Sequence, residues 1–329
     1  MEHHILLGID GGGTYVRAAI TDLKGNLLSY VKWNGGAYLH KDANANEHVR
    51  GAVMLALEKA NRRLSDIAGA VAGIAGYDSE RDMEWVRELT NFGGLNAVTQ
   101  HVNDAVIAHR GALRSRPGII AISGTGSVIY GITEAGRHIR NYDYGHYAAT
   151  AARCLSYNSV YRVIAGEIDQ TDSDFVEHVL KYFHVQDPAA LTKLGAVGFQ
   201  ADAAERNKLF GDMAPLVTKA ALKGSRMAAD VCRQAAAELT TGIRMIGASF
   251  EADTVSVALI GSVANSPAIK TALQSNFTIG RPKNFRIVDS YLPAVLGAVV
   301  MAMQLKAIDL NEEIDSNLRA GAGQIAQQA

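Results

Sequence analysis

Two short segments of this chain place glycines among polar residues directly after an apolar run. They read DGGGT at Asp10–Thr14 and SGTGS at Ser123–Ser127, here termed the first and second glycine turns. Glycine lacks a Cβ atom, so the N–H groups of such a turn can approach an anion closely and form an anion-binding concavity. The residues predicted to contact a phosphate chain between the two turns are Gly11, Gly12, Gly13, Thr14, Gly124, Thr125, Gly126 and Ser127.

Asp10 ends the first apolar run, where its carboxylate can hold a hydrated Mg²⁺ ion. Two other phosphate-binding motifs are absent from the sequence. No GxxxxGK[ST] segment occurs, and neither turn completes GxGxxG, because Val16 and Ile129 stand at the third glycine position. A lone DGGGT segment is a weak signal for phosphate, but two such turns at equivalent places are a much stronger one.

The elements that must position the turns are predicted from apolar runs bounded by polar or glycine residues. In the first half, strands are expected at Ile5–Asp10, Tyr15–Thr21 and Leu27–Trp33, with a polar turn at Asp22–Asn26. In the second half, strands are expected at Gly118–Ser123 and Val128–Thr133, with a turn at Glu134–Arg137. Aligning the halves places Thr14 opposite Ser127, and Gly25 opposite Gly136 after a two-residue gap. The alignment predicts one fold unit that is used twice.

Further elements follow from hydrophobic periodicity. Helices are expected at Glu47–Arg63, at Asp82–Asn91, through most of Asn158–Phe250 with Met227–Phe250 the longest, and from Pro293 onward. Strands are expected at Ile67–Ile74, Ala97–Val102, Thr254–Ile260 and Phe285–Val288. The tail after Leu310 is polar and rich in alanine and glutamine, and is expected to fray.

The bulk composition narrows the class of protein. A chain of 329 residues suggests two domains at about 100–200 residues each. A net charge of -1 gives no basic field for nucleic acid or an anionic membrane. The cysteines, Cys154 and Cys232, form no metal-ligand motif. The N-terminus lacks signal-peptide features, and the interrupted apolar run Leu292–Leu305 is too short to span a bilayer. We therefore expect a cytoplasmic protein without nucleic-acid or membrane partners.

Five segments, LGIDGGGT, VNDA, ISGTGS, ALIGSV and PAVLGA, occur in this order along the chain. On these segments the sequence resembles the BadF/BadG/BcrA/BcrD ATPase family, especially its N-acetylglucosamine kinase-like members, within the actin/sugar-kinase/Hsp70 superfamily. The resemblance covers essentially the whole chain. It implies an α/β, actin-like ATPase fold in which two ribonuclease-H-like domains flank a nucleotide cleft. The expected domains are residues 1–117 with about 290–329, and residues 118–289 with a helical insertion.

The resemblance also implies the cofactors and their sites. ATP and Mg²⁺ are expected, with the ATP phosphates at the two glycine turns and the metal at Asp10. Gly261 and Ser262 correspond to the adenosine-binding motif of the family. The C-terminal helix with Gly297 and Ala298 corresponds to the helix that returns to the first domain. A homodimer is expected from the family.

The segment Asn103-Asp104-Ala105 follows a predicted strand. By resemblance, Asp104 is the catalytic base that accepts the proton of an attacking sugar hydroxyl, a role typically worth about 10²–10⁴-fold in rate. An alternative is that Asp104 only caps the helix that starts near Ala105. Asn103 and Gly76, the latter in the family's substrate-side turn, are expected to contact the acceptor together with Asp104. His101, also at the end of this strand, is interpreted as structural.

The chain departs from the family after the second glycine turn. The N-acetylglucosamine kinases of the family usually carry a segment similar to GWGxxxGDEGS there, whose acidic residues help to hold sugar hydroxyls. Here Gly145 and His146 match and are assigned to substrate binding, but the GDEG positions read Ala149-Thr150-Ala151-Ala152. The ATP half of the site is therefore expected to be intact and the acceptor half altered. Loss of buried polar partners shifts the selectivity for the acceptor strongly.

Three functions remain open from the sequence. The leading hypothesis is an ATP-dependent kinase for a small-molecule sugar acceptor, with N-acetylglucosamine or glucosamine as the expected type. The second is a non-catalytic ATP- or sugar-binding sensor with a degenerate acceptor site. The third is a 2-hydroxyacyl-CoA dehydratase activator of the same family, which needs cysteine ligands for an iron–sulfur cluster shared across a dimer. Cys154 and Cys232 fit that requirement poorly.

Overall fold

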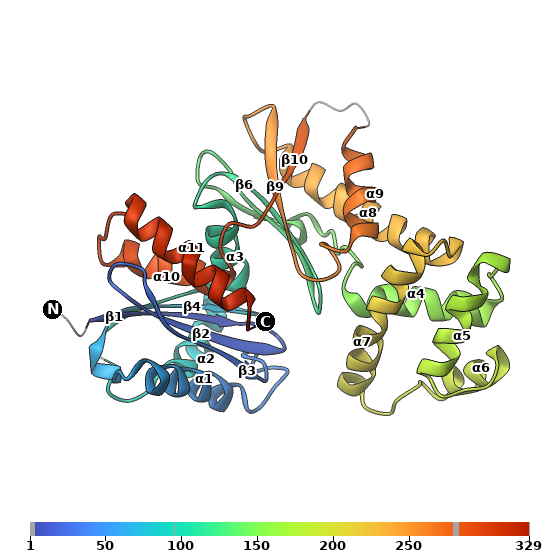
Figure 1. Ribbon diagram of the computed structural model, residues 1–329, viewed down its shortest axis with the longest axis horizontal. Coiled ribbons are helices and arrows are strands. Elements are labelled where there is room, and N and C mark those ends of the chain that lie inside the picture. The colour runs from blue at the N-terminus through green and yellow to red at the C-terminus, as the bar shows by residue number, and fades with distance from the viewer. Residues whose placement is uncertain (1–3, 96, 279–282, 329) are drawn as a thin grey trace. The chain divides into compact units, whose positions relative to one another are not determined.

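The computed structural model describes residues 4–95, 97–278 and 283–328 of the chain (Figure 1). The chain divides into two compact units. Unit 1 comprises Met1–Arg116 and Asp289–Ala329, and unit 2 comprises Pro117–Val288. The chain therefore passes from unit 1 into unit 2 once and returns once.

Unit 1 is built on a five-stranded sheet with strand order β3-β2-β1-β4-β5. The strands are β1 (Ile5–Gly11), β2 (Tyr15–Asp22), β3 (Leu27–Asn34), β4 (Ile67–Ile74) and β5 (Val98–Asn103). β1 pairs with β2 antiparallel and with β4 parallel, and β5 continues the parallel half. All seven residues of β1 are buried, because helices cover both faces of the sheet. The parallel strands β1, β4 and β5 end at one edge, which is where the chain places its polar residues.

The helices of unit 1 form two layers around this sheet (Figure 1). One layer holds α1 (Ala45–Ala60) and α2 (Met83–Leu89), whose apolar faces join the core that contains Leu7 and Ile9. The other holds α3 (Asp104–Leu113), α10 (Ala294–Leu305) and α11 (Glu312–Ala326), with α10 packed on both α3 and β1. The C-terminal segment is thus an integral part of the first unit.

Unit 2 repeats the sheet of unit 1, with strand order β10-β9-β6-β7-β8. Its strands are β6 (Gly118–Ser123), β7 (Ser127–Ile132), β8 (His138–Arg140), β9 (Thr254–Ile260) and β10 (Asn284–Val288). β6 pairs antiparallel with β7 and parallel with β9, as β1 does with β2 and β4. The predicted repeat of the fold unit is confirmed.

The helices of unit 2 lie mostly between β8 and β9 in the sequence. They are α4 (Ala152–Ala165), α5 (Ser173–Tyr182), α6 (Pro188–Ala196), α7 (Ala203–Leu222), α8 (Arg226–Gly247) and, after β9, α9 (Pro267–Thr278). The apolar stripe of α8 lies in the core of the unit with β6 and β7, while α4 to α7 pack on one another. No helix among the described residues is both long and apolar enough to cross a membrane.

The expectation that the tail after Leu310 frays is wrong. α11 is a regular helix whose start is capped by Asn311, with the Oδ1 atom accepting from the Ile314 N–H group at 2.9 Å. Ile314, Leu318 and Ile325 are each at most 5% exposed and belong to the core shared with α10. The spacing of these three residues places them on one helical face, which offsets the polarity of the rest of the segment.

Candidate functional site

The first glycine turn joins β1 to β2 and is fixed at its base. Gly11 packs so closely that a Cβ atom there would lie 2.7 Å from both Ala37 Cβ and Ile74 Cδ1. The Ala75 N–H donates to Gly11 O at 2.8 Å, and the Gly12 N–H donates to Tyr15 O at 3.1 Å. At the tip, by contrast, a Cβ atom on Gly13 would meet nothing within 4 Å. The turn is therefore rigid where it joins the sheet and open where an anion would approach.

Asp10 is held by an arginine that sequence reasoning did not find. The β1–β2 register sets Asp10 opposite Arg17, and Arg17 Nη1 donates to Asp10 Oδ2 at 3.1 Å. Burial raises the pKa of Asp10, and the Arg17 guanidinium opposes this shift. Counting back from the turn along both strands of the hairpin would have revealed the pair, because antiparallel partners are fixed by the turn.

The start of α3 separates the roles of Asn103 and Asp104. The Asn103 Oδ1 atom accepts from the Ala105 N–H at 2.9 Å, so Asn103 is the N-cap and the capping alternative for Asp104 is wrong. Asn103 Nδ2 donates to Tyr77 O at 3.1 Å and to Asp78 Oδ1 at 3.3 Å. The amide of Asn103 therefore fixes the strand–helix junction, and Asp104 is the first residue of the helix.

Asp104 has the electrostatic properties of a proton acceptor. Burial, and then the negative charges of Asp10 and Asp78, raise its pKa to about 7, against the opposing effect of the Ala105 N–H group. A carboxyl whose pKa lies near neutrality is well matched to general-base catalysis. Because Asp10 is the last residue but one of β1 and Asp104 follows β5, both lie at the carboxyl edge of the parallel strands.

Gly76 lies at the same edge, just after β4. Its φ angle is +80°, and a Cβ atom there would lie 2.5 Å from the Tyr38 ring, so only glycine fits. His101, at the end of β5, has its Nε2 atom 2.7 Å from Thr90 Oγ1. Burial and the nearby Arg87 lower the pKa of His101. Unit 1 thus brings together Asp10, the first glycine turn, Gly76, Asn103 and Asp104.

The second glycine turn joins β6 to β7 and is anchored by the altered segment at residues 149–152. Ser123 Oγ donates to Thr150 O at 2.5 Å, and Ser127 Oγ lies 2.6 Å from Thr150 Oγ1. The Ala152 N–H donates to Gly124 O at 2.7 Å. A Cβ atom on Gly126 would meet nothing within 4 Å, so this turn also has an open tip. Thr150 is fully buried and supports the turn from beneath.

The Gly261-Ser262 segment lies against this turn within unit 2. Gly261 has φ +93°, and a Cβ atom there would lie 2.3 Å from Ser123 O, so the close approach requires glycine. Ser123 O also accepts from the N–H groups of Val263 and Ala264, each at 3.1 Å. The parallel pairing of β6 and β9 therefore brings Gly124, Thr125, Gly126 and Ser127 together with Gly261 and Ser262.

Gly145 and His146 have structural contacts in unit 2. Gly145, with φ +67°, ends a short 3₁₀ helix at Asn141–Tyr144. The His146 ring packs against α8, where a Cβ atom on Gly242 would lie 3.2 Å from the ring, and its Nε2 atom is 3.5 Å from Glu238 Oε2. Asn141 Nδ2 donates to His146 O at 2.7 Å. These contacts place the His146 ring against the helical layer.

The acidic, histidine and cysteine side chains of the described residues are poorly placed for metal binding. Within the described residues, no three His, Cys, Asp or Glu side chains gather closely enough to hold a metal ion. A Mg²⁺ ion at Asp10 would therefore take its other ligands from water and phosphate, as Mg²⁺ commonly does. Burial in α8 raises the pKa of the Cys232 thiol to about 11, which disfavours the thiolate that a metal needs.

Comparisons with known proteins place the chain in a family. A sequence model of the BadF/BadG/BcrA/BcrD ATPase family matches residues 7–302. The chain is 23% identical over 302 residues to the N-acetylmuramic acid/N-acetylglucosamine kinase of Clostridium acetobutylicum, covering 90% of this chain and 97% of that one.

Solved structures share the fold. A Chromobacterium violaceum protein, provisionally assigned as an N-acetylglucosamine kinase, superposes with a TM-score of 0.65 at 22% identity, covering 91% of this chain and 99% of that one. A ROK family glucokinase from Streptomyces griseus, solved with glucose and AMPPNP, gives 0.62 at 18% identity, with coverage of 91% and 99%. The expected fold class is confirmed by these likenesses.

Proposed function

Since the chain belongs to the BadF/BadG/BcrA/BcrD ATPase family, we propose that it is an ATP-dependent phosphotransferase acting on a hydroxyl of a sugar or amino sugar. The observation that carries the proposal is the position and pKa of Asp104, a near-neutral carboxyl at the same sheet edge as a glycine turn. The kinase relatives named above, from Clostridium acetobutylicum and Streptomyces griseus, support the sugar as the class of acceptor.

In this proposal the two glycine turns bind the ATP phosphates and the Gly261-Ser262 segment lies beside the adenosine. Both turns are fixed by backbone hydrogen bonds at the base and open at Gly13 and Gly126. Mg²⁺ would be held through Asp10, where it would offset the charge of the phosphates. The hydrogen bond from Arg17 restrains the Asp10 carboxylate.

Alanine at either open glycine tests the nucleotide half. Gly13→Ala and Gly126→Ala are expected to leave the melting temperature unchanged, because neither Cβ atom meets a neighbour within 4 Å. The added methyl group would instead occupy the space that a phosphate needs, and the affinity for ATP should fall at least about tenfold, as loss of roughly one charge-assisted hydrogen bond does. Isothermal titration with a non-hydrolysable ATP analogue measures this.

Gly211→Ala is the matched control for this test. It lies in α7, and its Cβ atom also meets nothing within 4 Å, so nucleotide affinity should stay at the wild-type level. Stability should rise by about 1 kcal/mol, as alanine favours a helix over glycine. If Gly13→Ala and Gly126→Ala bind the analogue as the control does, the assignment of the turns to phosphate is wrong.

Asp104 acts on the acceptor in the proposed reaction. Its ionised carboxylate accepts a hydrogen bond from the attacking hydroxyl, orients it toward the γ-phosphoryl group, and takes its proton late in the transfer. Asn103 positions Asp104 by capping α3, and the Gly76 turn lies at the same edge. Burial, and then the charges of Asp10 and Asp78, keep the pKa of Asp104 high enough for this task.

A pH profile follows from the raised pKa of Asp104. The base must be ionised, so kcat/KM is expected to fall toward acid pH with an apparent pKa of about 7. Asp78→Asn removes one of the charges that raise the pKa while keeping the oxygen that Asn103 contacts, and should move the acid limb to lower pH. Glu84→Gln, in α2, removes a charge that is not among the causes of the shift and should leave the limb in place.

The acceptor is expected to be N-acetylglucosamine, glucosamine or a related sugar, and a coupled assay of ADP release tests it. The panel should contain sugars, amino sugars and N-acetyl sugars, each compared with the rate in water alone. Turnover with one acceptor, together with phosphate on that sugar by mass spectrometry, supports the kinase. If no acceptor raises ADP release above the water rate, the proposal fails.

A second candidate function is a sensor that binds ATP or a sugar without turnover. One observation favours it: Thr150, at the first of the two acidic positions, is buried, and its side-chain hydroxyl is hydrogen-bonded to Ser127 while its backbone oxygen accepts from Ser123. Its side chain is therefore committed to the second glycine turn rather than offered to an acceptor. Sugar binding by titration without ADP release would favour the sensor.

A further inference from the structure

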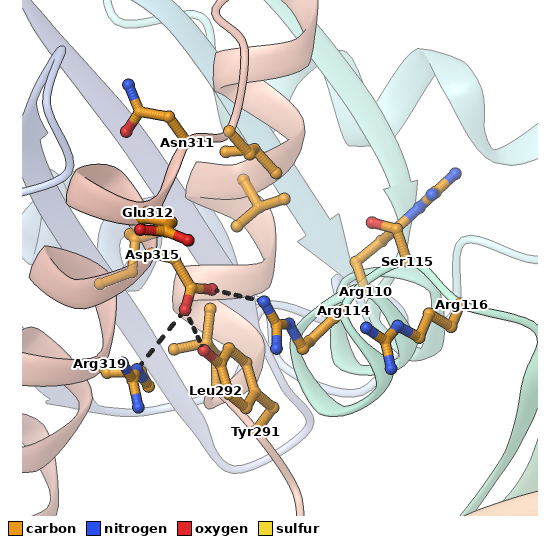
Figure 2. A pocket seen from close by; sticks show the side chains of 13 residues that line it. Arg110, Arg114, Ser115, Arg116, Tyr291, Leu292, Asn311, Glu312, Asp315 and Arg319 are labelled. Carbon is orange, nitrogen blue, oxygen red and sulfur yellow. Dashed lines mark hydrogen bonds and ion pairs between the residues drawn. The ribbon is translucent and has the colours of Figure 1, made fainter.

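A cavity of about 660 Å³ in unit 1 lies away from every residue assigned above (Figure 2). It is bounded by the C-terminal end of α3, the segment that follows Asp289, and helices α10 and α11. Asp104 is at the opposite end of α3. The apolar part of the lining comprises Tyr291, Leu292, Val300, Leu310 and Leu318. A cavity of this size is in the range of small-molecule pockets.

The charge of the lining is predominantly positive. Four arginines, Arg110, Arg114, Arg116 and Arg319, face two carboxylates, Glu312 and Asp315, which leaves two positive charges in excess. Within the described residues, the ion pairs of this pocket centre on one carboxylate. Figure 2 shows Arg114, Arg319 and Tyr291 converging on Asp315. The distances from Asp315 to Arg114 Nη2 and Arg319 Nε are 3.2 Å and 3.5 Å.

The remaining donors lie on the other side of the pocket from Asp315 (Figure 2). Arg110 Nε and Ser115 Oγ are buried and have no hydrogen-bond partner among the described residues. Arg116 is exposed and forms no ion pair with any of the residues that the structure describes. An unsatisfied buried donor costs about 1–3 kcal/mol. Two buried donors without a partner, on Arg110 and Ser115, therefore line the same pocket as the exposed guanidinium of Arg116.

The backbone between these donors is also unusual. Arg114 and Ser115 are consecutive non-glycine residues with φ angles of 56° and 60°. Left-handed geometry is disfavoured for residues with a Cβ atom, and such strain gathers at functional sites. Here it ends α3 and directs Ser115 and Arg116 to the pocket, since the Ser115 N–H turns back to Arg110 O at 3.3 Å.

We propose that this pocket binds a phosphate dianion, either free or as the monoester of a small organic molecule. Two guanidinium groups and a hydroxyl supply donors for several oxygens of one tetrahedral anion, which a monocarboxylate could not satisfy. The two excess positive charges match a dianion, and the apolar lining can accept the carbon body of an ester. The site is independent of the glycine turns and of the proposed kinase activity.

The pocket is lined by α3 and by the two segments of chain that connect unit 1 to unit 2. Arg110 belongs to α3, the helix that begins at Asp104. Arg116 is the last residue of unit 1 before the chain enters unit 2, and Tyr291 follows directly after the chain returns. An anion bound here would therefore contact the helix of the proposed base and both connections between the units.

Isothermal titration of the full-length protein at low salt tests the proposal with three probes: inorganic phosphate, glucose 6-phosphate and malate. At least one phosphate probe is expected to bind, and malate more weakly. Arg116→Gln and Arg110→Gln should each weaken that binding about tenfold or more, since each removes a charge-assisted contact. Glu312→Gln removes a negative charge from the lining and should tighten it.

Two controls separate this pocket from other anion sites. Arg226→Gln removes an arginine of unit 2 whose side chain is 73% exposed, and should not change the binding. Gly13→Ala should also retain phosphate binding at the pocket. If the phosphate were bound at the first glycine turn instead, this variant would lose it. Preference for glucose 6-phosphate identifies an ester, and equal binding identifies free phosphate; both support the site.

Three outcomes would overturn the proposal. The first is that neither phosphate probe binds, or that malate binds better than both. The second is that Arg116→Gln, which alters an exposed side chain and should fold normally, binds as the wild type does. The third is that Gly13→Ala abolishes the binding. Melting temperatures of all variants show whether a loss of binding reflects a loss of fold.

Discussion

Asp104→Asn is expected to lower kcat for sugar phosphorylation by about 10²–10⁴-fold, the range typical of a lost general base, while the affinity for ATP is retained. The amide has the size of the carboxyl but cannot take a proton. Coupled ADP release with the best acceptor measures kcat, and titration with a non-hydrolysable analogue measures nucleotide binding. Turnover within a few-fold of wild type would remove Asp104 from the mechanism.

The same variant should be more stable than wild type at neutral and alkaline pH. The folded pKa of Asp104 is about 7, raised from 3.8, so the folded state holds this proton more tightly than the unfolded state. Stability from Asp104 is complete below about pH 4 and is lost as pH rises through 7. Asparagine has no such loss, so its advantage should grow from pH 4 to 7 and then level off.

Melting curves of both proteins at pH 5 and pH 8 test whether the stability advantage of Asp104→Asn grows with pH. At pH 8 the advantage of Asp104→Asn should exceed about 1 kcal/mol, or ~2–4 °C for a domain of this size, and it should be smaller at pH 5. Equal advantages at both values would mean that burial does not raise the pKa. A catalytic residue is expected to show both effects: its replacement makes the protein more stable and lowers turnover.

Gly297→Ala is expected to reduce the free energy of unfolding of unit 1 by about 3 kcal/mol. A Cβ atom there would lie 2.0 Å from Ile107 O and 2.7 Å from the Gly111 backbone nitrogen, so α10 and α3 would have to separate. Backbone atoms cannot move aside as a flexible side chain can. Because α3 carries Asp104, turnover should fall together with stability.

Gly323→Ala is the matched control, since it lies in α11 with nothing within 4 Å of its Cβ atom. Alanine favours a helix over glycine by roughly 1 kcal/mol, so this variant should gain stability. Urea unfolding followed by tryptophan fluorescence suits the comparison, because both tryptophans, Trp33 and Trp85, are in unit 1. If Gly297→Ala unfolds at the same urea concentration as the control, close packing of α3 and α10 is not essential.

The sheets were largely predictable from the sequence because their strands are continuous apolar runs. The ranges Ile67–Ile74, Gly118–Ser123 and Thr254–Ile260 agree with the structure at both ends. These strands lie in the centre of sheets covered on both faces, so burial dominates their composition. Helix ends were less well predicted: the helix expected at Glu47–Arg63 spans Ala45–Ala60, because Asn61 adopts φ 51° and ends it.

The missed features depend on contacts between residues that are not neighbours in the sequence. Arg17 faces Asp10 only through hairpin register, and Thr150 supports the second glycine turn from 23 residues beyond Ser127. The α11 helix was missed because only three large apolar residues, Ile314, Leu318 and Ile325, are spaced among polar residues, alanine and glycine. Asp315 joins α11 to Arg114 across 201 residues of chain. The Asp10–Arg17 pair could have been found by counting along the hairpin, but local patterns carry no information on the contacts of Thr150 and Asp315. Glycine turns and strand ends, by contrast, are local signals.

The insertion of unit 2 into unit 1 fixes an order of assembly during synthesis. The ribosome completes all of Pro117–Val288 before it makes α10, the helix whose residues Val295 and Val299 pack with Leu6 and Ile107. Until then the face of the first sheet that α10 covers carries only α3, although its strands have already emerged. Unit 2 is a continuous segment and can fold at once, so here the second unit must mature first, against the usual order along a nascent chain. Premature termination after residue 288 would leave unit 2 joined to a first unit that lacks α10 and α11 and exposes apolar residues of its sheet.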